Sequence, residues 1–185
     1  GLGHIGKEVA KLLQPFGVKI IACDRVDVSE FCRQWNVESV SAEGLWARSD
    51  VLTIHLPRNK STIGMYTADV LAKLKPGAIL INCARGGIVD ETALYEALKS
   101  GHLAGAALDV YRYEPVPDDC PLLDLDNVLW TPHTSGGRPE FMIRESEDVL
   151  ANLARVLKGE KPNGQLSPAG ADTPKRGPFG WLTGA

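Results

Sequence analysis

The stretch Gly1-Leu2-Gly3-His4-Ile5-Gly6 decides the fold, because its G-x-G-x-x-G spacing is typical of a phosphate-binding turn. Such a turn normally follows a β-strand and begins a helix. The apolar spacing of Val9, Leu12 and Leu13 predicts that helix. The preceding strand is missing from the chain, so we expect either unpaired strand edges in the middle of the sheet or the two flanking strands brought together.

Continuous apolar runs alternate with helical patterns along the rest of the chain. Strands are predicted over 18–24, 50–56, 78–83, 104–110 and 127–130, and helices over 6–13, 29–35, 41–48, 67–74, 90–99 and 140–157. Continuous apolar strands indicate burial on both faces, as in a parallel sheet. The prediction is an α/β fold, a doubly wound parallel sheet of the Rossmann type with its first strand missing, over residues 1–159. Residues 160–185, rich in Pro, Gly, Lys and Ser, are predicted to be a disordered or weakly ordered tail.

Charge and composition exclude several classes of partner. A net charge of −3 without a basic stripe argues against nucleic acid and anionic membranes, and no apolar run is long enough to span a bilayer. The four cysteines have no C-x-x-C spacing, so we expect free thiols, a cytoplasmic location and no metal site.

Asp24 is the second residue signal that accompanies the glycine-rich turn. It ends the first predicted strand, 18 residues after Gly6, near the interval expected for an acid that binds the adenosine ribose. A carboxylate there accepts from ribose hydroxyls and repels a 2′-phosphate, which favours NAD over NADP, although the neighbouring Arg25 leaves NADP open. The alternative is a structural turn followed by a strand-ending Asp.

Three further segments carry a resemblance to a known family: SDVLTIHLP, LKPGAILINCARGGIVDETALYEALKSGHLAGAALDVYRYEP and NVLWTPHTSGG. With GLGHIG they span residues 1 to about 158 and resemble the D-isomer-specific 2-hydroxyacid dehydrogenases. The resemblance implies an NAD-dependent oxidoreductase that transfers a hydride between nicotinamide and a small 2-hydroxy or 2-oxo acid. It also implies a homodimer, and a fragment that lacks the family's N-terminal substrate domain.

The resemblance implies three catalytic residues. Arg85 holds the substrate carboxylate, His133 is the general acid/base, and Glu114 raises the pKa of that histidine and fixes its tautomer. Without the resemblance, each has a plainer interpretation as a surface arginine, a loop histidine bonded to backbone, or a solvated loop acid.

The resemblance also implies the residues around the cofactor. Backbone N–H groups of the turn hold the pyrophosphate, and Asp109 accepts from the carboxamide unless it only caps its strand. The full predicted set is Gly1, Gly3, His4, Ile5, Gly6, Asp24, Leu56, Pro57, Thr62, Cys83, Ala84, Arg85, Asp109, His133, Ser135 and Gly136.

Two other functions stay open at this point. The same fold occurs in corepressors that bind NAD(H) without turnover, and some of these keep the catalytic trio. The chain could also be an inactive remnant. Which 2-hydroxy acid is the substrate cannot be read from these residues.

Overall fold

The computed structural model describes residues 1–164 of the chain. These form two compact units, one over Gly1–Gly136 and one that begins at Gly137. The predicted domain over 1–159 would include the long helix of the second unit and stays a prediction. The predicted tail over 160–185 falls mainly on residues outside the described part.

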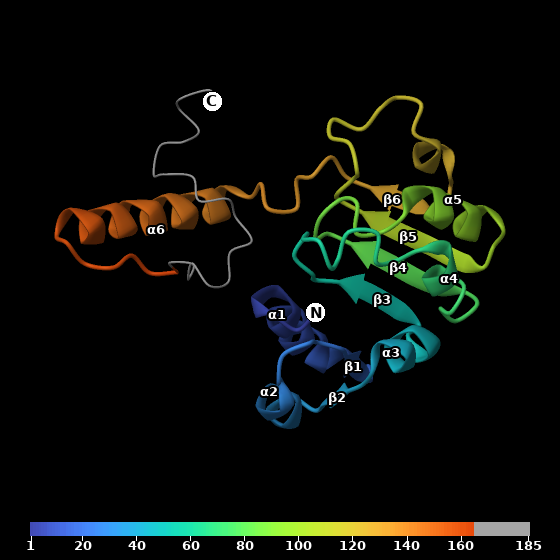
Figure 1. The fold of residues 1–185 in the computed structure, drawn as a ribbon, viewed down its shortest axis with the longest axis horizontal. Helices are drawn as coiled ribbons and strands as arrows, with labels where there is room; N and C mark the ends of the chain where they lie inside the picture. Colours follow the sequence, from blue (N-terminus) through green and yellow to red (C-terminus); the bar gives the residue numbers. More distant parts are fainter. Residues whose placement is uncertain (165–185) are drawn as a thin grey trace. The chain divides into compact units, whose positions relative to one another are not determined.

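The first unit alternates helices and strands, and every predicted element is present (Figure 1). The strands are β1 (Ile20–Ala22), β2 (Val37–Ser39), β3 (Val51–Ile54), β4 (Ala78–Asn82), β5 (Leu103–Leu108) and β6 (Val128–Trp130). The helices are α1 (His4–Leu13), α2 (Ser29–Gln34), α3 (Ala42–Arg48), α4 (Ala68–Leu71) and α5 (Glu91–Lys99), with 3-10 turns at η1 (Gln14–Phe16) and η2 (Pro121–Asp124).

All strand pairs are parallel, but the described strands form two sheets. β1 pairs with β2, and the larger sheet has the order β3-β4-β5-β6 (Figure 1). β1 and β3 are not paired, so the flanking strands are not brought together. Gly1 lies at the ends of both strands, since its nitrogen donates to the Cys23 carbonyl at 3.0 Å and an added Cβ would lie 2.6 Å from the His55 carbonyl oxygen.

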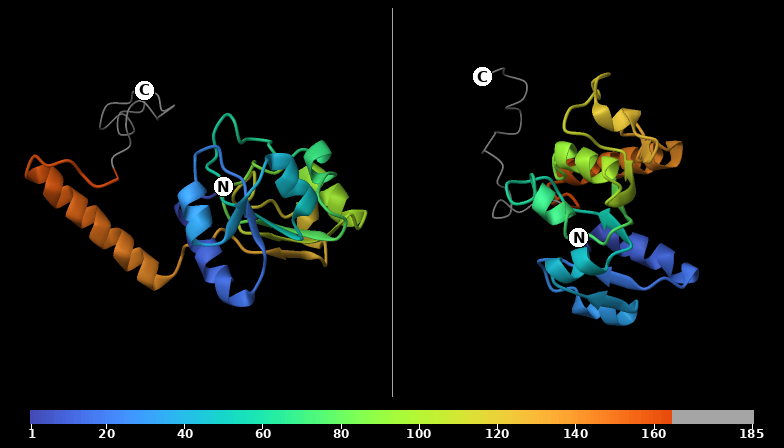
Figure 2. Two further views of the ribbon diagram at one scale, coloured as in Figure 1. Left: turned by 90° about the horizontal axis from the view of Figure 1, so that it is seen from below. Right: turned by 90° about the vertical axis from the view of Figure 1, so that its right-hand side faces the viewer.

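One face of the larger sheet holds the main core. Leu52, Leu80 and Leu103 are almost fully buried there beneath α4 and α5, which lie on the same side of the sheet (Figure 2). The Asp90 side chain begins α5 by accepting from the amides of Thr92 and Ala93, as expected of an N-cap.

The prediction that these strands are buried on both faces is wrong for part of the sheet. Val51, Ile79 and Leu129 expose 53%, 40% and 71% of their surface. Helices α4 and α5 pack on the opposite face, so they do not cover these apolar side chains.

A smaller core joins α1 and α2 to the β1–β2 pair. Its buried residues are Leu2, Ala10, Ala22, Val28, Cys32 and Val37. β2 was not predicted because Val37 is its single buried residue, and one apolar side chain between polar neighbours gives no strand period.

The second unit contains α6 (Pro139–Leu157). Pro139 is its first residue, where the missing proline N–H costs no helical hydrogen bond. Met142, Val149, Leu153 and Val156 form an apolar stripe at helical spacing and are exposed. Among the described residues, no helix combines the length and apolar character needed to cross a membrane.

Candidate nucleotide and catalytic site

The glycines of the first turn differ in what surrounds them. A Cβ on Gly6 would lie 2.3 Å from the Gly1 carbonyl oxygen, so both the turn and the start of α1 exclude a side chain there. A Cβ on Gly3, by contrast, would meet no atom within 4 Å. The open space at Gly3 is what a phosphate needs in order to approach the backbone closely.

The N-terminus of α1 supplies donors to the same space. Gly3 is the N-cap and its side-chain position offers no acceptor, so the amides of the first turn, at His4, Ile5 and Gly6, have no partner in the helix. The first turn holds no acidic residue. Free amides and the positive end of the helix dipole together suit a pyrophosphate, and the turn therefore fits a dinucleotide.

Asp24 lies beside this turn. Its Oδ2 accepts from the Leu2 amide at 2.6 Å, and its Oδ1 accepts from the Val26 amide at 3.1 Å. Burial would raise the pKa of Asp24, but these backbone hydrogen bonds outweigh it and hold the pKa below its usual value. The carboxylate is thus ionised at neutral pH, and since two oxygens offer about four acceptor positions, it can still accept from a ribose.

The loop after β3 brings Leu56, Pro57 and Thr62 to this edge. A Leu56 methyl carbon lies 3.0 Å from the position of a Gly1 Cβ, so Leu56 borders the glycine turn. Thr62 is buried, donates to the Pro57 carbonyl at 2.6 Å and accepts from the Asn59 amide at 2.9 Å. Its hydroxyl therefore closes the loop, and a contact with cofactor stays a prediction.

The turn that carries Arg85 begins directly after β4. Buried Asn82 brackets it, because its side chain accepts from the Ala84 amide at 3.1 Å and donates to the Arg85 carbonyl at 3.2 Å. The strand ends at Asn82, one residue before the predicted end, so Cys83 is exposed. The Arg85 side chain is exposed too and donates to the Ala84 carbonyl at 2.6 Å, which leaves most of its guanidinium donors available.

His133 and Glu114 are in direct contact. His133 Nδ1 lies 2.7 Å from Glu114 Oε2, and Glu114 Oε1 accepts from the Tyr111 amide at 3.0 Å. The hydrogen bond to His133 is the main reason that the pKa of Glu114 lies below its usual value. Because a carboxylate accepts, Nδ1 carries the proton in this bond, and Nε2 has no hydrogen-bond partner among the described residues.

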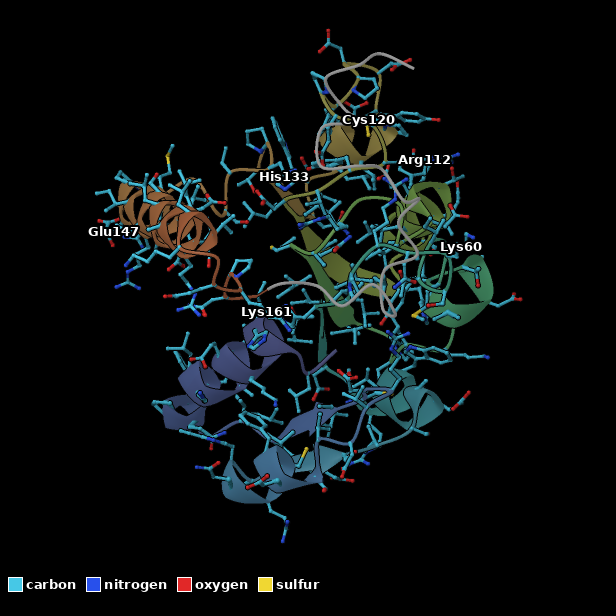
Figure 3. All side chains as sticks on the ribbon, turned by 60° about the vertical axis from the view of Figure 1, so that its left-hand side comes forward. Lys60, Arg112, Cys120, His133, Glu147 and Lys161 are labelled. Atoms are coloured by element: carbon cyan, nitrogen blue, oxygen red, sulfur yellow. The ribbon has the colours of Figure 1, made fainter. Side chains whose placement is uncertain are left out.

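His133 itself stands in a left-handed backbone conformation, with φ of 55°. Few residues other than glycine adopt it, and such conformations collect at functional sites. The His133 amide also donates to the Thr131 carbonyl at 3.0 Å, which closes a tight turn after β6. Figure 3 labels His133 in this loop.

Asp109 is hydrogen-bonded to the loop that carries His133. It is 2% exposed and accepts from the Thr131 hydroxyl, from the Thr134 amide at 2.9 Å and from the Ser135 amide at 3.1 Å. Burial would raise its pKa, but these donors lower it below its usual value. Asp109 thus anchors the loop of His133, and its predicted contact with a carboxamide, like those of Ser135 and Gly136, stays a prediction.

The three predicted catalytic residues share one edge of the larger sheet. Arg85 follows β4, Glu114 follows β5 and His133 follows β6, and the carboxyl ends of parallel strands are where open α/β sheets bind ligands. A Cβ on Gly86 would lie only 1.7 Å from the Tyr111 carbonyl oxygen. The turn of Arg85 therefore touches the segment that carries Glu114.

Sequence reasoning missed Asn82 and Tyr111. Asn82 is the polar end of an otherwise apolar strand, which is a usable signal for a residue that shapes the next turn. Tyr111 supplies only its backbone amide to Glu114, so its residue type carries no such signal.

Comparisons with known proteins agree with this geometry. Residues 1–135 match the family model described as D-isomer specific 2-hydroxyacid dehydrogenase, NAD binding domain. A D-3-phosphoglycerate dehydrogenase from Archaeoglobus fulgidus is 44% identical over 159 residues, which make up 86% of this chain and 30% of that protein. A glyoxylate reductase from Korarchaeum cryptofilum is 41% identical over 162 residues, which make up 88% of this chain and 49% of that protein.

Among solved structures, a D-isomer specific 2-hydroxyacid dehydrogenase from Xanthobacter autotrophicus Py2, in complex with NADPH and MES, superimposes with a TM-score of 0.79 at 36% identity. The match covers 91% of this chain and 69% of that one. The chain belongs to the D-isomer specific 2-hydroxyacid dehydrogenases and corresponds to their NAD-binding domain. The predicted doubly wound Rossmann fold is thereby confirmed. The chain spans less than half of the length of the two curated relatives named above.

Proposed function

We propose that this chain is the catalytic NAD-binding part of a dehydrogenase that interconverts a small 2-hydroxy acid and the matching 2-oxo acid. The observation that carries the proposal is the His133–Glu114 pair, with an imidazole nitrogen 2.7 Å from a carboxylate oxygen. An imidazole held in one tautomer, with its other nitrogen not bonded to the described residues, is suited to move a proton to or from a substrate oxygen.

Each residue has one role in the proposed reaction. Arg85 binds the substrate carboxylate through two parallel N–H donors, which places C2 and its oxygen near His133. When bound, the nicotinamide supplies or accepts the hydride at C2. In the reduction, the His133 proton moves from Nε2 to the substrate oxygen, and Glu114 stabilises the imidazolium before the transfer.

The dinucleotide would be held at the other end of the same edge. The first-turn amides of α1 would bind the pyrophosphate, and Asp24 would accept from the adenosine ribose. An ionised carboxylate repels a 2′-phosphate, so we propose that NAD is preferred over NADP. The Xanthobacter relative is named as a complex with NADPH. The affinities of this chain for NADH and NADPH should therefore be measured side by side.

We further propose a homodimer in the cytoplasm. Leu12 and Phe16 expose 71% and 74% of their surface on and after α1, which fits apolar contact with a second subunit. The four cysteines are free thiols, as is usual in a reducing compartment. Light scattering of the purified protein measures the subunit count.

Turnover and binding measurements test the proposed function. The purified chain, and the full-length product of its gene, are assayed with NADH and a panel of 2-oxo acids. We expect His133→Asn to lower kcat by about 10² or more, since general acid–base catalysis contributes on that order. His102→Asn is the matched control, because the His102 ring is hydrogen-bonded to the Leu71 carbonyl at 3.2 Å, outside the proposed site.

The same samples separate the other functions. NADH binding that Asp24→Ala weakens, with no turnover of any 2-oxo acid, would replace the enzyme with a non-catalytic NAD(H)-binding module. A folded chain that binds neither NADH nor NADPH would contradict the proposal altogether.

A further inference from the structure

We propose that Glu91 is a positioning residue for the Glu114–His133 pair, an inference that rests on the proposed function of that pair. Glu91 is the first residue of α5, and its Oε1 accepts from the Arg112 amide at 2.6 Å. Arg112 lies two residues before Glu114 in the chain. Glu91 thus holds the backbone segment that presents the proposed partner of His133.

Two carboxylates accept hydrogen bonds from successive amides of this segment. Glu114 Oε1 accepts from the Tyr111 amide, and Glu91 Oε1 accepts from the next amide, that of Arg112. The first contact is local, since both of its residues belong to the segment itself. The second contact comes from a different element, so it links the exposed residues after Tyr111 to α5.

The start of α5 is itself fixed by its N-cap. The N-cap Asp90 accepts from the amides of Thr92 and Ala93, which holds the first turn of the helix and with it Glu91. Gly86, immediately after Arg85, touches the Tyr111 carbonyl. Glu91 and Gly86 therefore contact adjacent residues of the segment that leads to Glu114.

A cavity borders the segment that is hydrogen-bonded to Glu91. A space of about 230 Å³ lies between α5 and the segment after β5, and Glu91, Tyr95, Tyr113 and Cys120 are among its lining residues. Figure 3 labels Arg112 and Cys120 in this segment. Close packing usually fixes a loop, but on this side the cavity interrupts it. A strong hydrogen bond to a carboxylate takes over that role.

A competing explanation is that Glu91 only supplies negative charge at the N-terminus of α5, where acids are favourable. Two substitutions separate the explanations. Glu91→Gln removes the charge and keeps an acceptor oxygen at the same reach, whereas Glu91→Asp keeps the charge and shortens the side chain by one methylene. If Glu91 positions the segment, Glu91→Gln should keep the wild-type Glu114 titration and kcat, and Glu91→Asp should change both. If only the charge matters, Glu91→Asp should keep them and Glu91→Gln should change them.

The readout is the carboxyl titration of Glu114, followed by carbon-detected NMR in the full chain. In the wild type, its pKa lies below the usual value because of the hydrogen bond to His133. In Glu91→Asp we expect the pKa of Glu114 to rise towards the usual value, because the loosened segment moves away from His133. In Glu91→Gln we expect it to stay low. Glu96→Asp, an exposed acid on the same helix, is the control and should change nothing.

Kinetics give a second readout. We expect kcat to fall about tenfold in Glu91→Asp and by less than about twofold in Glu91→Gln, because sub-ångström misplacement weakens proton transfer without removing it. Equal Glu114 titration in the wild type and Glu91→Asp, or equal disturbance by Asp and Gln, would overturn the proposal. If the wild type shows no turnover, the proposed function fails, while the titration still decides the role of Glu91.

Discussion

Replacing Gly86 with alanine is the sharpest test of how the segments of Arg85 and Glu114 are held together. The added Cβ would lie 1.7 Å from the Tyr111 carbonyl oxygen and 2.1 Å from its carbonyl carbon. Both neighbours are backbone, so no side chain can rotate away to make room. The turn of Arg85 and the segment of Glu114 must therefore separate.

The size of that separation follows from the distance. Cβ atoms in proteins essentially never approach another heavy atom within 3.0 Å, so the two segments must part by at least about 1.3 Å. Overpacking of this kind costs about 1–3 kcal/mol, which corresponds to a fall in Tm of about 4–8 °C for a middle value in a chain of this size. A displacement of about 1 Å between catalytic groups lowers turnover by about 10².

Thermal unfolding and steady-state turnover measure both effects. Gly3→Ala is the matched control, since its Cβ would meet no protein atom within 4 Å. We expect Gly3→Ala to keep most of the stability but to bind NADH more weakly, because the methyl group occupies the space proposed for the pyrophosphate. If Gly86→Ala unfolds at the wild-type temperature and turns over at the wild-type rate, the contact between these segments does not hold the site.

Three further predictions concern stability. Ser41→Ala removes the N-cap that accepts from the Gly44 amide at 3.1 Å, and we expect a loss of about 1 kcal/mol in urea unfolding, which an unchanged midpoint would contradict. Leu94→Ala empties a fully buried position and should cost about 2–5 kcal/mol by the same measurement, whereas a loss below about 1 kcal/mol would mean that α5 is loosely packed. Because the pKa values of Asp109 and Glu114 are lowered in the folded state, their stabilisation is present above the usual carboxyl pKa and disappears as the pH falls through the folded values. Tm should therefore fall on acidification below about pH 4, less steeply in Asp109→Asn, and parallel curves for the two proteins would refute this assignment.

Much of the fold could be predicted because its boundaries are set by local chemistry. Ser41 and Asp90 have the side chains of N-caps, and α3 and α5 begin directly after them. The strands were predicted too long. The strand predicted over 18–24, for example, pairs with β2 through Ile20–Ala22 alone among the described residues. Apolar character continues beyond the residues that find a hydrogen-bonded neighbour, and pairing depends on the rest of the sheet.

The residues of the candidate site could be predicted from the sequence, but the hydrogen bonds that hold them in place could not. The resemblance gave Arg85, Glu114 and His133 in chain order, and the strand pattern brings them to one edge. The bonds from Asp109 to the His133 loop and from Glu91 to Arg112 join side chains to backbone amides. Because every residue type but proline offers such an amide, no sequence pattern marks the partner.

The position of β6 has a consequence for how the protein loses function. β6 has three residues, pairs with β5 alone among the strands of residues 1–164 and is half-buried at best, whereas the neighbouring strands contain fully buried side chains. Edge segments of this kind open locally at much lower free energy than the core. Fraying of β6 would carry His133 away from Glu114 while the remaining strands stay folded. Amide exchange at Leu129 and Trp130 should therefore be faster than at Leu80, and heat or denaturant should abolish the proposed proton transfer before the sheet melts.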